Sequence, residues 1–155
     1  MSRFILTKDF VGKAFLLLTE VHDQVVRNCF FADFVTPDVI WTMAGSAHSL
    51  AGTRHSLQSH MDATFNHLRR RLQELIKFVV TKIIVDTERS EDGWWACIEA
   101  KGQATRKTGH AYNNDYIWLT RWNDEGRIAE VRYYFDTMLS EQVLQEAGNT
   151  MGLAQ

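Results

Sequence analysis

The chain has 155 residues, of which 45% are hydrophobic and 23% charged, and its formal net charge is −2. This length suits one domain with a substantial core, so we predict a single domain over residues 1–155. The composition argues against disorder and a disulfide scaffold, and the small charge argues against nucleic-acid or membrane partners.

The compartment is inferred from the cysteines and the N-terminus. Cys29 and Cys97 lie far apart and lack metal-ligand spacing, which favours two buried thiols in a reducing environment. The apolar residues of the first ten positions are too few for a signal segment or a membrane span. We therefore expect a cytoplasmic protein.

The N-terminal half predicts two helices separated by a strand. Apolar residues recur at three- and four-residue spacing over residues 7–27, with Thr7 as N-cap, which predicts one long amphipathic helix. A short helix or turn is expected at residues 28–36, before a strand at residues 39–43. A second helix is expected to begin at Gly52 and to extend over residues 52–72.

Beyond residue 76 the hydrophobic period changes from helical to β. Three turn signals divide this part into antiparallel strands expected at residues 78–88, 94–106, 110–122 and 127–136. Strands of this length bend strongly, so we expect a curved sheet with a concave face. A short last helix is expected at residues 140–147, with Gly148 just beyond it as C-cap. This segregation of helices and strands is typical of the α+β class.

One face of the third long strand carries aromatic and polar side chains. Residues two apart share a face of a strand, and those on this face include Tyr112, Asn114, Tyr116 and Trp118. If residues 123–126 form a four-residue loop, Tyr116 is paired with Tyr133 on the next strand. The other parity holds Glu130 and Arg132, which favours an exposed face or a subunit contact. We therefore expect the tyrosine face to point inward.

Several segments carry a family resemblance. Residues 109–116 (GHAYNNDY), 124–128 (DEGRI) and 132–137 (RYYFDT), together with residues 34–52, resemble SnoaL-like proteins of the nuclear-transport-factor-like superfamily. This family includes polyketide cyclases and ketosteroid isomerase-related proteins. The resemblance implies a cone-shaped, curved antiparallel or mixed sheet with helices over its concave face, which enclose a pocket for a small apolar molecule. It also implies a homodimer, but it does not select one reaction.

The resemblance bears on individual residues as well. In similar proteins an acid/base group often lies on the last strand, three positions before its closing Asp. This chain has Tyr133 at that position instead of Asp or Glu, which weakens a hydrolase assignment. Tyr112 and Tyr116 match tyrosines that line the pocket or act in it.

The candidate catalytic residues are Tyr116, Tyr133, Tyr112, His55 and Glu99. A neutral tyrosine donates well to a developing oxyanion but is a poor base, so a base is needed from elsewhere. His55 lies near the start of the second helix, where the pocket mouth is expected. Glu99 faces Trp118 on the tyrosine face if the turn at residues 108–109 has two residues, and a longer turn reverses that parity.

The candidate substrate-binding residues are Trp41, Met43, His60, Phe65, Asn114 and Trp118. No metal ligand set is expected, because His55 and His60 lie five residues apart and so on different faces of a helix. No nucleotide or metal motif is present, and no cofactor is expected.

These observations favour a cofactor-independent isomerase or cyclase that acts on a polyketide, terpenoid or related secondary metabolite by tyrosine-assisted acid/base catalysis. Three alternatives stay open. The first is a non-catalytic, dimeric small-molecule-binding module, and the second is a hydrolase or dehydratase that uses the same pocket. The third is an aromatic stripe that only fills the core, because buried Tyr and Trp often do so.

Overall fold

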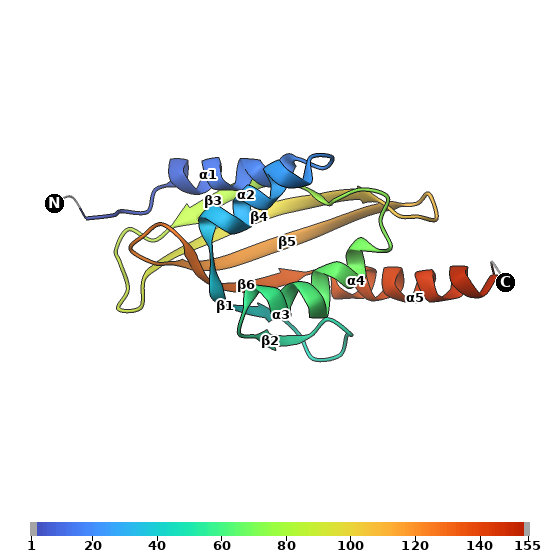
Figure 1. Ribbon diagram of the computed structural model, residues 1–155. Helices are drawn as coiled ribbons and strands as arrows, with labels where there is room; N and C mark the ends of the chain where they lie inside the picture. The colour runs from blue at the N-terminus through green and yellow to red at the C-terminus, as the bar shows by residue number, and fades with distance from the viewer. Residues whose placement is uncertain (1–2, 154–155) are drawn as a thin grey trace.

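Six strands form one mixed β-sheet that curves around the interior (Figure 1). The structure is a computed structural model that describes the backbone of residues 3–153 and the side chains of residues 3–146. The strands are ordered β2-β1-β6-β5-β4-β3; β1 pairs with β6 in parallel, and the other pairs are antiparallel. Their bounds are β1 Val35–Met43, β2 Gly52–Arg54, β3 Lys77–Val85, β4 Trp94–Thr105, β5 Ala111–Trp122 and β6 Ile128–Phe135.

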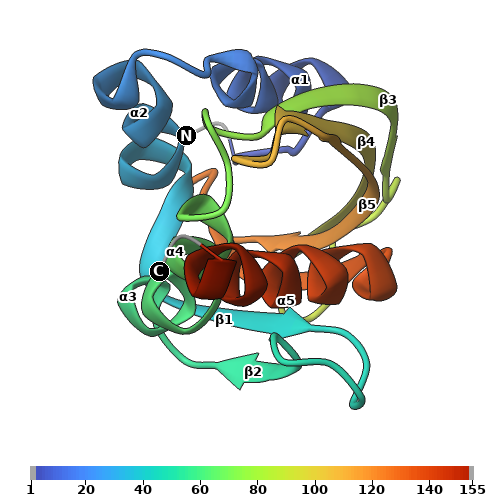
Figure 2. The same ribbon diagram turned by 90° about the vertical axis from the view of Figure 1, so that its right-hand side faces the viewer.

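The helices pack beside this sheet, and Figure 2 shows its bend around them. Helix α1 contacts β3, and α3 contacts β1. The bounds are α1 Lys8–Leu16, η1 Leu17–Thr19, α2 Gln24–Phe34, α3 Leu57–His60, η2 Met61–Phe65, α4 Asn66–Arg69 and α5 Thr137–Leu153. The predicted α+β class and curved sheet are therefore confirmed. Across residues 3–153, no helix combines the length and the apolar character needed to cross a membrane.

The prediction of one helix over residues 7–27 is wrong. Helix α1 does begin after the expected N-cap, Thr7, but α2 starts anew at Gln24. Between them, the Glu20 carboxylate accepts hydrogen bonds from the backbone N–H of His22 and of Asp23, at 2.9 and 2.7 Å. The Asp23 carboxylate in turn caps α2. Polar residues that fit the solvent face of one long helix thus form a helix break.

The second predicted helix begins later than expected. Gly52 opens strand β2 with a φ of 126°, a conformation that favours glycine, and the helix starts only after Ser56. The Ser56 hydroxyl caps it by accepting from the Ser59 backbone N–H at 3.0 Å. From Leu57 the chain stays helical to Arg69, but η2 is a π-helical turn. At the other end of the chain, Gly148 lies inside α5, so its predicted role as C-cap is wrong.

The four long strands of the C-terminal half are confirmed, but one register differs. Tyr116 pairs with Phe135, and Tyr133 pairs with Trp118, so the predicted Tyr116–Tyr133 pair is wrong. The loop is closed by Asn123, whose N–H donates to the Arg127 carbonyl at 2.8 Å, and an irregularity within β6, between Ile128 and Glu130, adds a second one-residue shift. Because the two shifts sum to an even number, the inward face is unchanged.

Candidate functional site

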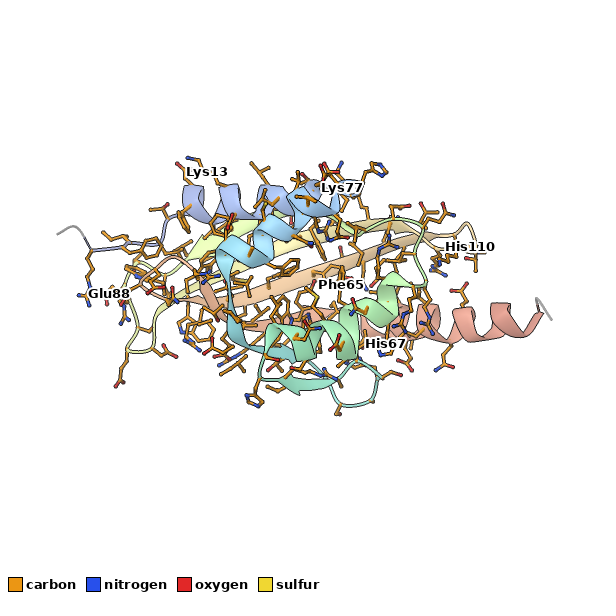
Figure 3. The ribbon with its side chains drawn as sticks, viewed as in Figure 1. Lys13, Phe65, His67, Lys77, Glu88 and His110 are labelled. Carbon is orange, nitrogen blue, oxygen red and sulfur yellow. The ribbon has the colours of Figure 1, made fainter. Side chains whose placement is uncertain are left out.

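A small, partly open cavity of about 40 Å³ lies between the inner face of the sheet and the helical segment α3–η2–α4. It has space for a few water molecules. Phe65 projects from η2 toward the sheet (Figure 3). The apolar walls include Met43, Leu50, Phe65, Leu68, Phe78 and Phe135. The polar residues in the lining are His60, Thr64, Tyr116 and Tyr133.

Tyr116 and Tyr133 meet at this cavity, although their backbones are not directly paired. Their ring centroids are 5.1 Å apart, and the rings lie edge to face. Burial, reinforced by neighbouring tyrosines, raises the pKa of both hydroxyls well above the usual value, so both are neutral donors. Within the described residues, the Tyr133 hydroxyl has no hydrogen-bond partner, although the residue is only 8% exposed.

A buried hydrogen-bond network holds Tyr116 from behind. The Tyr112 hydroxyl lies 2.7 Å from that of Tyr116 and 2.9 Å from Ser140 Oγ. Asn114 Nδ2 donates to the Tyr112 hydroxyl at 3.0 Å, and Asn114 Oδ1 accepts from the backbone N–H of Asp136 at 3.0 Å. The polar atoms of the Tyr112 and Asn114 side chains are bonded to other groups of the protein, and neither residue lines the cavity. They fix strand β5 to the start of α5.

His60 forms a second polar edge of the cavity. Its ring stacks on Trp41, with centroids 3.9 Å apart and 10° between the planes. Nδ1 lies 3.1 Å from Thr64 Oγ1. Burial, with a smaller contribution from Arg54, lowers the pKa of His60 to about 3, so the imidazole is neutral at physiological pH. Trp41 itself does not line the cavity, but it contacts His60, which does.

The structure brings neither predicted base to the cavity. Glu99 was expected opposite Trp118, but it pairs with Ile117, and its carboxylate accepts from Thr81 Oγ1 at 2.7 Å on the exposed face. The cause is a three-residue loop, residues 107–109, where two residues were expected, so the parity is reversed. His55 lies exposed in the turn before α3 and outside the cavity lining.

Of the remaining substrate-binding candidates, some line the cavity and one packs against a residue that lines it. Met43 and Phe65 line the cavity as expected, whereas Trp118 lies behind Tyr133, with ring centroids 4.8 Å apart. Thr64 was not among the predicted site residues, although its position four residues after His60 places the two on one helical face. The cavity therefore combines apolar walls with two neutral phenols and one neutral imidazole.

Arg27 is a further buried polar residue that the sequence did not single out. It is 1% exposed, and its guanidinium donates to the carbonyl oxygens of Leu18 and Glu20 at 3.1 and 2.8 Å. Burial lowers its pKa to about 10. These bonds join η1 to α2, which gives Arg27 a structural role beside the ring of Phe78. Among the described residues, no cluster of His, Cys, Asp or Glu could hold a metal ion.

The fold of the described residues is that of NTF2-like proteins. No family model and no curated protein matches the sequence. A solved NTF2-like protein of unknown function from Burkholderia pseudomallei K96243 matches with a TM-score of 0.63 and 18% identity, over 88% of this chain and 95% of that chain. The predicted resemblance to the nuclear-transport-factor-like superfamily is thus confirmed at the level of the fold.

Two further solved structures have assigned names. TerC, co-crystallised with polyporic acid, matches with a TM-score of 0.63 and 14% identity over 88% of this chain and 96% of that chain. A steroid delta-isomerase from Pseudomonas aeruginosa matches with a TM-score of 0.52 and 16% identity over 95% of this chain and 93% of that chain. At these identities the likeness concerns the fold.

Proposed function

We propose that this protein is a cofactor-independent isomerase or cyclase that acts on a small, largely apolar metabolite, such as a polyketide or terpenoid, in the cavity beside Tyr116 and Tyr133. The observation that carries the proposal is the Tyr133 hydroxyl, which makes no hydrogen bond within the described residues, on a side chain that lines the cavity. A phenol hydroxyl without a protein partner is free to donate to a ligand oxygen in the cavity.

The two phenols suit the stabilisation of a developing negative charge on oxygen. Because their pKa values are raised, both keep their protons and can donate to a carbonyl that becomes an enolate. A ligand that fills the space between the apolar walls would displace water, and hydrogen bonds are stronger in such a low-dielectric site. The solved relatives add support, since a steroid delta-isomerase and a protein crystallised with polyporic acid share the fold.

A metabolite needs more space than about 40 Å³, so the proposal requires the cavity to open. The helical segment above it is the element that would move. Its middle, η2, is a π-helical turn, and such turns occur frequently at functional sites. Phe65 on this turn is half-buried and lines the cavity, so rotation of its side chain would enlarge the space.

The test is turnover of a panel of unsaturated cyclic ketones, hydroxyquinones and polyketide-like aromatics, followed by mass spectrometry of the products. For a converted compound, Tyr133→Phe should lower kcat about 10²- to 10³-fold, because one oxyanion donor is lost. Tyr134→Phe is the matched control, since this neighbouring tyrosine is 48% exposed and lies on the other face of β6. Full turnover by Tyr133→Phe would remove Tyr133 from the mechanism.

A non-catalytic small-molecule-binding module is the second candidate. The observation that favours it is that no carboxylate occurs among the described residues that line the cavity, so a strong base is lacking there. Thermal-shift screening on the same panel separates the two candidates, because binding without any product supports this one. Incorporation of oxygen-18 from solvent would instead support a hydrolase or dehydratase.

A further inference from the structure

The hydrogen bonds around His60 define which of its ring nitrogens carries the proton. Thr64 Oγ1 lies 2.6 Å from the His60 carbonyl oxygen and 3.1 Å from His60 Nδ1. The hydroxyl has one proton, and a carbonyl oxygen can only accept. The short contact to the carbonyl therefore takes the Thr64 proton, and the contact to Nδ1 requires a proton on Nδ1.

The other ring nitrogen is then an unprotonated acceptor. Within the described residues, Nε2 of His60 has no hydrogen-bond partner, although the residue is only 5% exposed and lines the cavity. The stack on Trp41 fixes the plane of the ring, and the Thr64 contact fixes its rotation. A neutral imidazole held in this way is prepared to accept one hydrogen bond.

We infer that Nε2 of His60 accepts a hydrogen bond from a hydroxyl group of the ligand, while the Tyr133 hydroxyl donates to a carbonyl oxygen of the same ligand. Both residues line one cavity. His60 offers an acceptor, Nε2, and Tyr133 offers a donor, its hydroxyl, and neither atom has a partner among the described residues. The inference rests on the proposed ligand cavity, but it does not require catalysis.

This pairing defines the chemical class of the ligand. It must carry a hydrogen-bond donor and an acceptor on an apolar frame, as enols, phenolic ketones and hydroxyketones do. An uncharged form is favoured, because the imidazole is neutral and the two cations that act on His60 and Tyr133, Arg54 and Arg27, lie outside the described lining. Charged acids would leave a buried charge unpaired.

The first experiment is long-range proton–nitrogen NMR of the histidine rings at about pH 7, with His60 assigned by its loss in His60→Phe. The expected result is a protonated Nδ1 and an unprotonated Nε2. A proton on Nε2, or on both nitrogens, would overturn the inference. The Phe variant keeps an aromatic ring to stack on Trp41, so it is expected to fold.

The second experiment titrates phenol and anisole into the wild-type chain and into His60→Phe. Anisole is the methyl ether of phenol and therefore lacks the hydroxyl proton. Phenol should shift the Nε2 signal and bind about fivefold or more tightly than anisole, as one hydrogen bond would give. His60→Phe should remove this preference, and His55→Phe, the same change at an exposed position, should keep it. Tyr133→Phe should instead weaken binding of cyclohexenone, a carbonyl probe, by a similar factor.

Three results of this titration would also overturn the inference: equal binding of phenol and anisole, a preference that survives in His60→Phe, or an Nε2 signal unmoved by phenol up to its solubility. A failure of the proposed catalysis looks different. In that case phenol shifts Nε2 as expected, but no compound of the panel is converted.

Discussion

Gly102 on β4 lies directly against the ring of Tyr116. A Cβ atom on Gly102 would stand 2.5 Å from Cε2 of Tyr116 and 3.0 Å from Cγ2 of Ile76. Both distances are shorter than van der Waals contact, so only glycine lets the Tyr116 ring lie over this strand. The cavity wall thus depends on the absence of a side chain at residue 102.

Gly102→Ala is therefore expected to displace the Tyr116 ring and to lower the free energy of unfolding by about 1–3 kcal/mol, as overpacking does. Chemical denaturation measures this loss. Gly12→Ala is the matched control, because the nearest atom to its Cβ is 3.7 Å away and Gly12 lies within helix α1. It should stabilise the chain by about 0.5–1 kcal/mol. Equal effects of the two changes would show that Gly102 is not constrained by Tyr116.

Tyr133 and Tyr112 should respond differently to loss of the hydroxyl. Tyr133→Phe removes a group without a partner among the described residues, so the free energy of unfolding should change by less than about 1 kcal/mol. Tyr112→Phe removes the hydroxyl that bonds Tyr116, Ser140 and Asn114, and it leaves the buried Tyr116 hydroxyl without a partner among the described residues, so it should cost about 1–3 kcal/mol. Thermal and denaturant unfolding compare the two variants. A large loss in Tyr133→Phe would mean that its hydroxyl has a structural partner.

The inward face of β5 could be predicted from the sequence, because residues two apart on a strand always share one face. Tyr112, Asn114, Tyr116 and Trp118 are all buried, as expected for one face of a strand against a core. Positions across hairpins were less predictable. A Thr-Gly sequence fits turns of two or three residues, and the extra residue moved Glu99 to the exposed face.

The role of His60 depended on tertiary contacts that no local pattern contains. Its partner ring, Trp41, lies on β1, and the two meet because the helical segment packs over that strand. The sequence did place His60 among the substrate-binding candidates, but it made His55 and not His60 a candidate base. Only the spacing to Thr64 could have indicated a fixed ring.

His60 should make the stability of the chain depend on pH. Its pKa is lowered to about 3 in the folded chain from 6.5, chiefly by burial. The unfolded chain therefore binds more protons between these values, so stability is full above about pH 6.5 and falls as the pH drops. From about pH 7 to about pH 5 this group should cost about 2 kcal/mol of unfolding free energy.

Denaturation of the wild-type chain and of His60→Phe at both pH values tests this expectation. The variant should lack the loss that His60 causes, while His55→Phe should retain it because His60 is unchanged. Identical pH dependence of the wild type and His60→Phe would show that His60 is not held neutral by burial.

The outer face of the sheet is expected to form a homodimer interface. Ile84 and Tyr134 are 53% and 48% exposed there, and Arg132 lies over the Trp95 ring at 4.9 Å. Ile84 on β3 and Tyr134 on β6 are separated by β4 and β5, so exposed apolar side chains are spread across this face, which favours an interface. Light scattering should therefore give twice 17.9 kDa for the wild type.

Ile84→Glu should lower the mass toward one chain, because it would bury an unpaired charge. Val25→Glu, at a 77% exposed site on α2, should leave it unchanged. A wild-type mass of 17.9 kDa would refute the dimer.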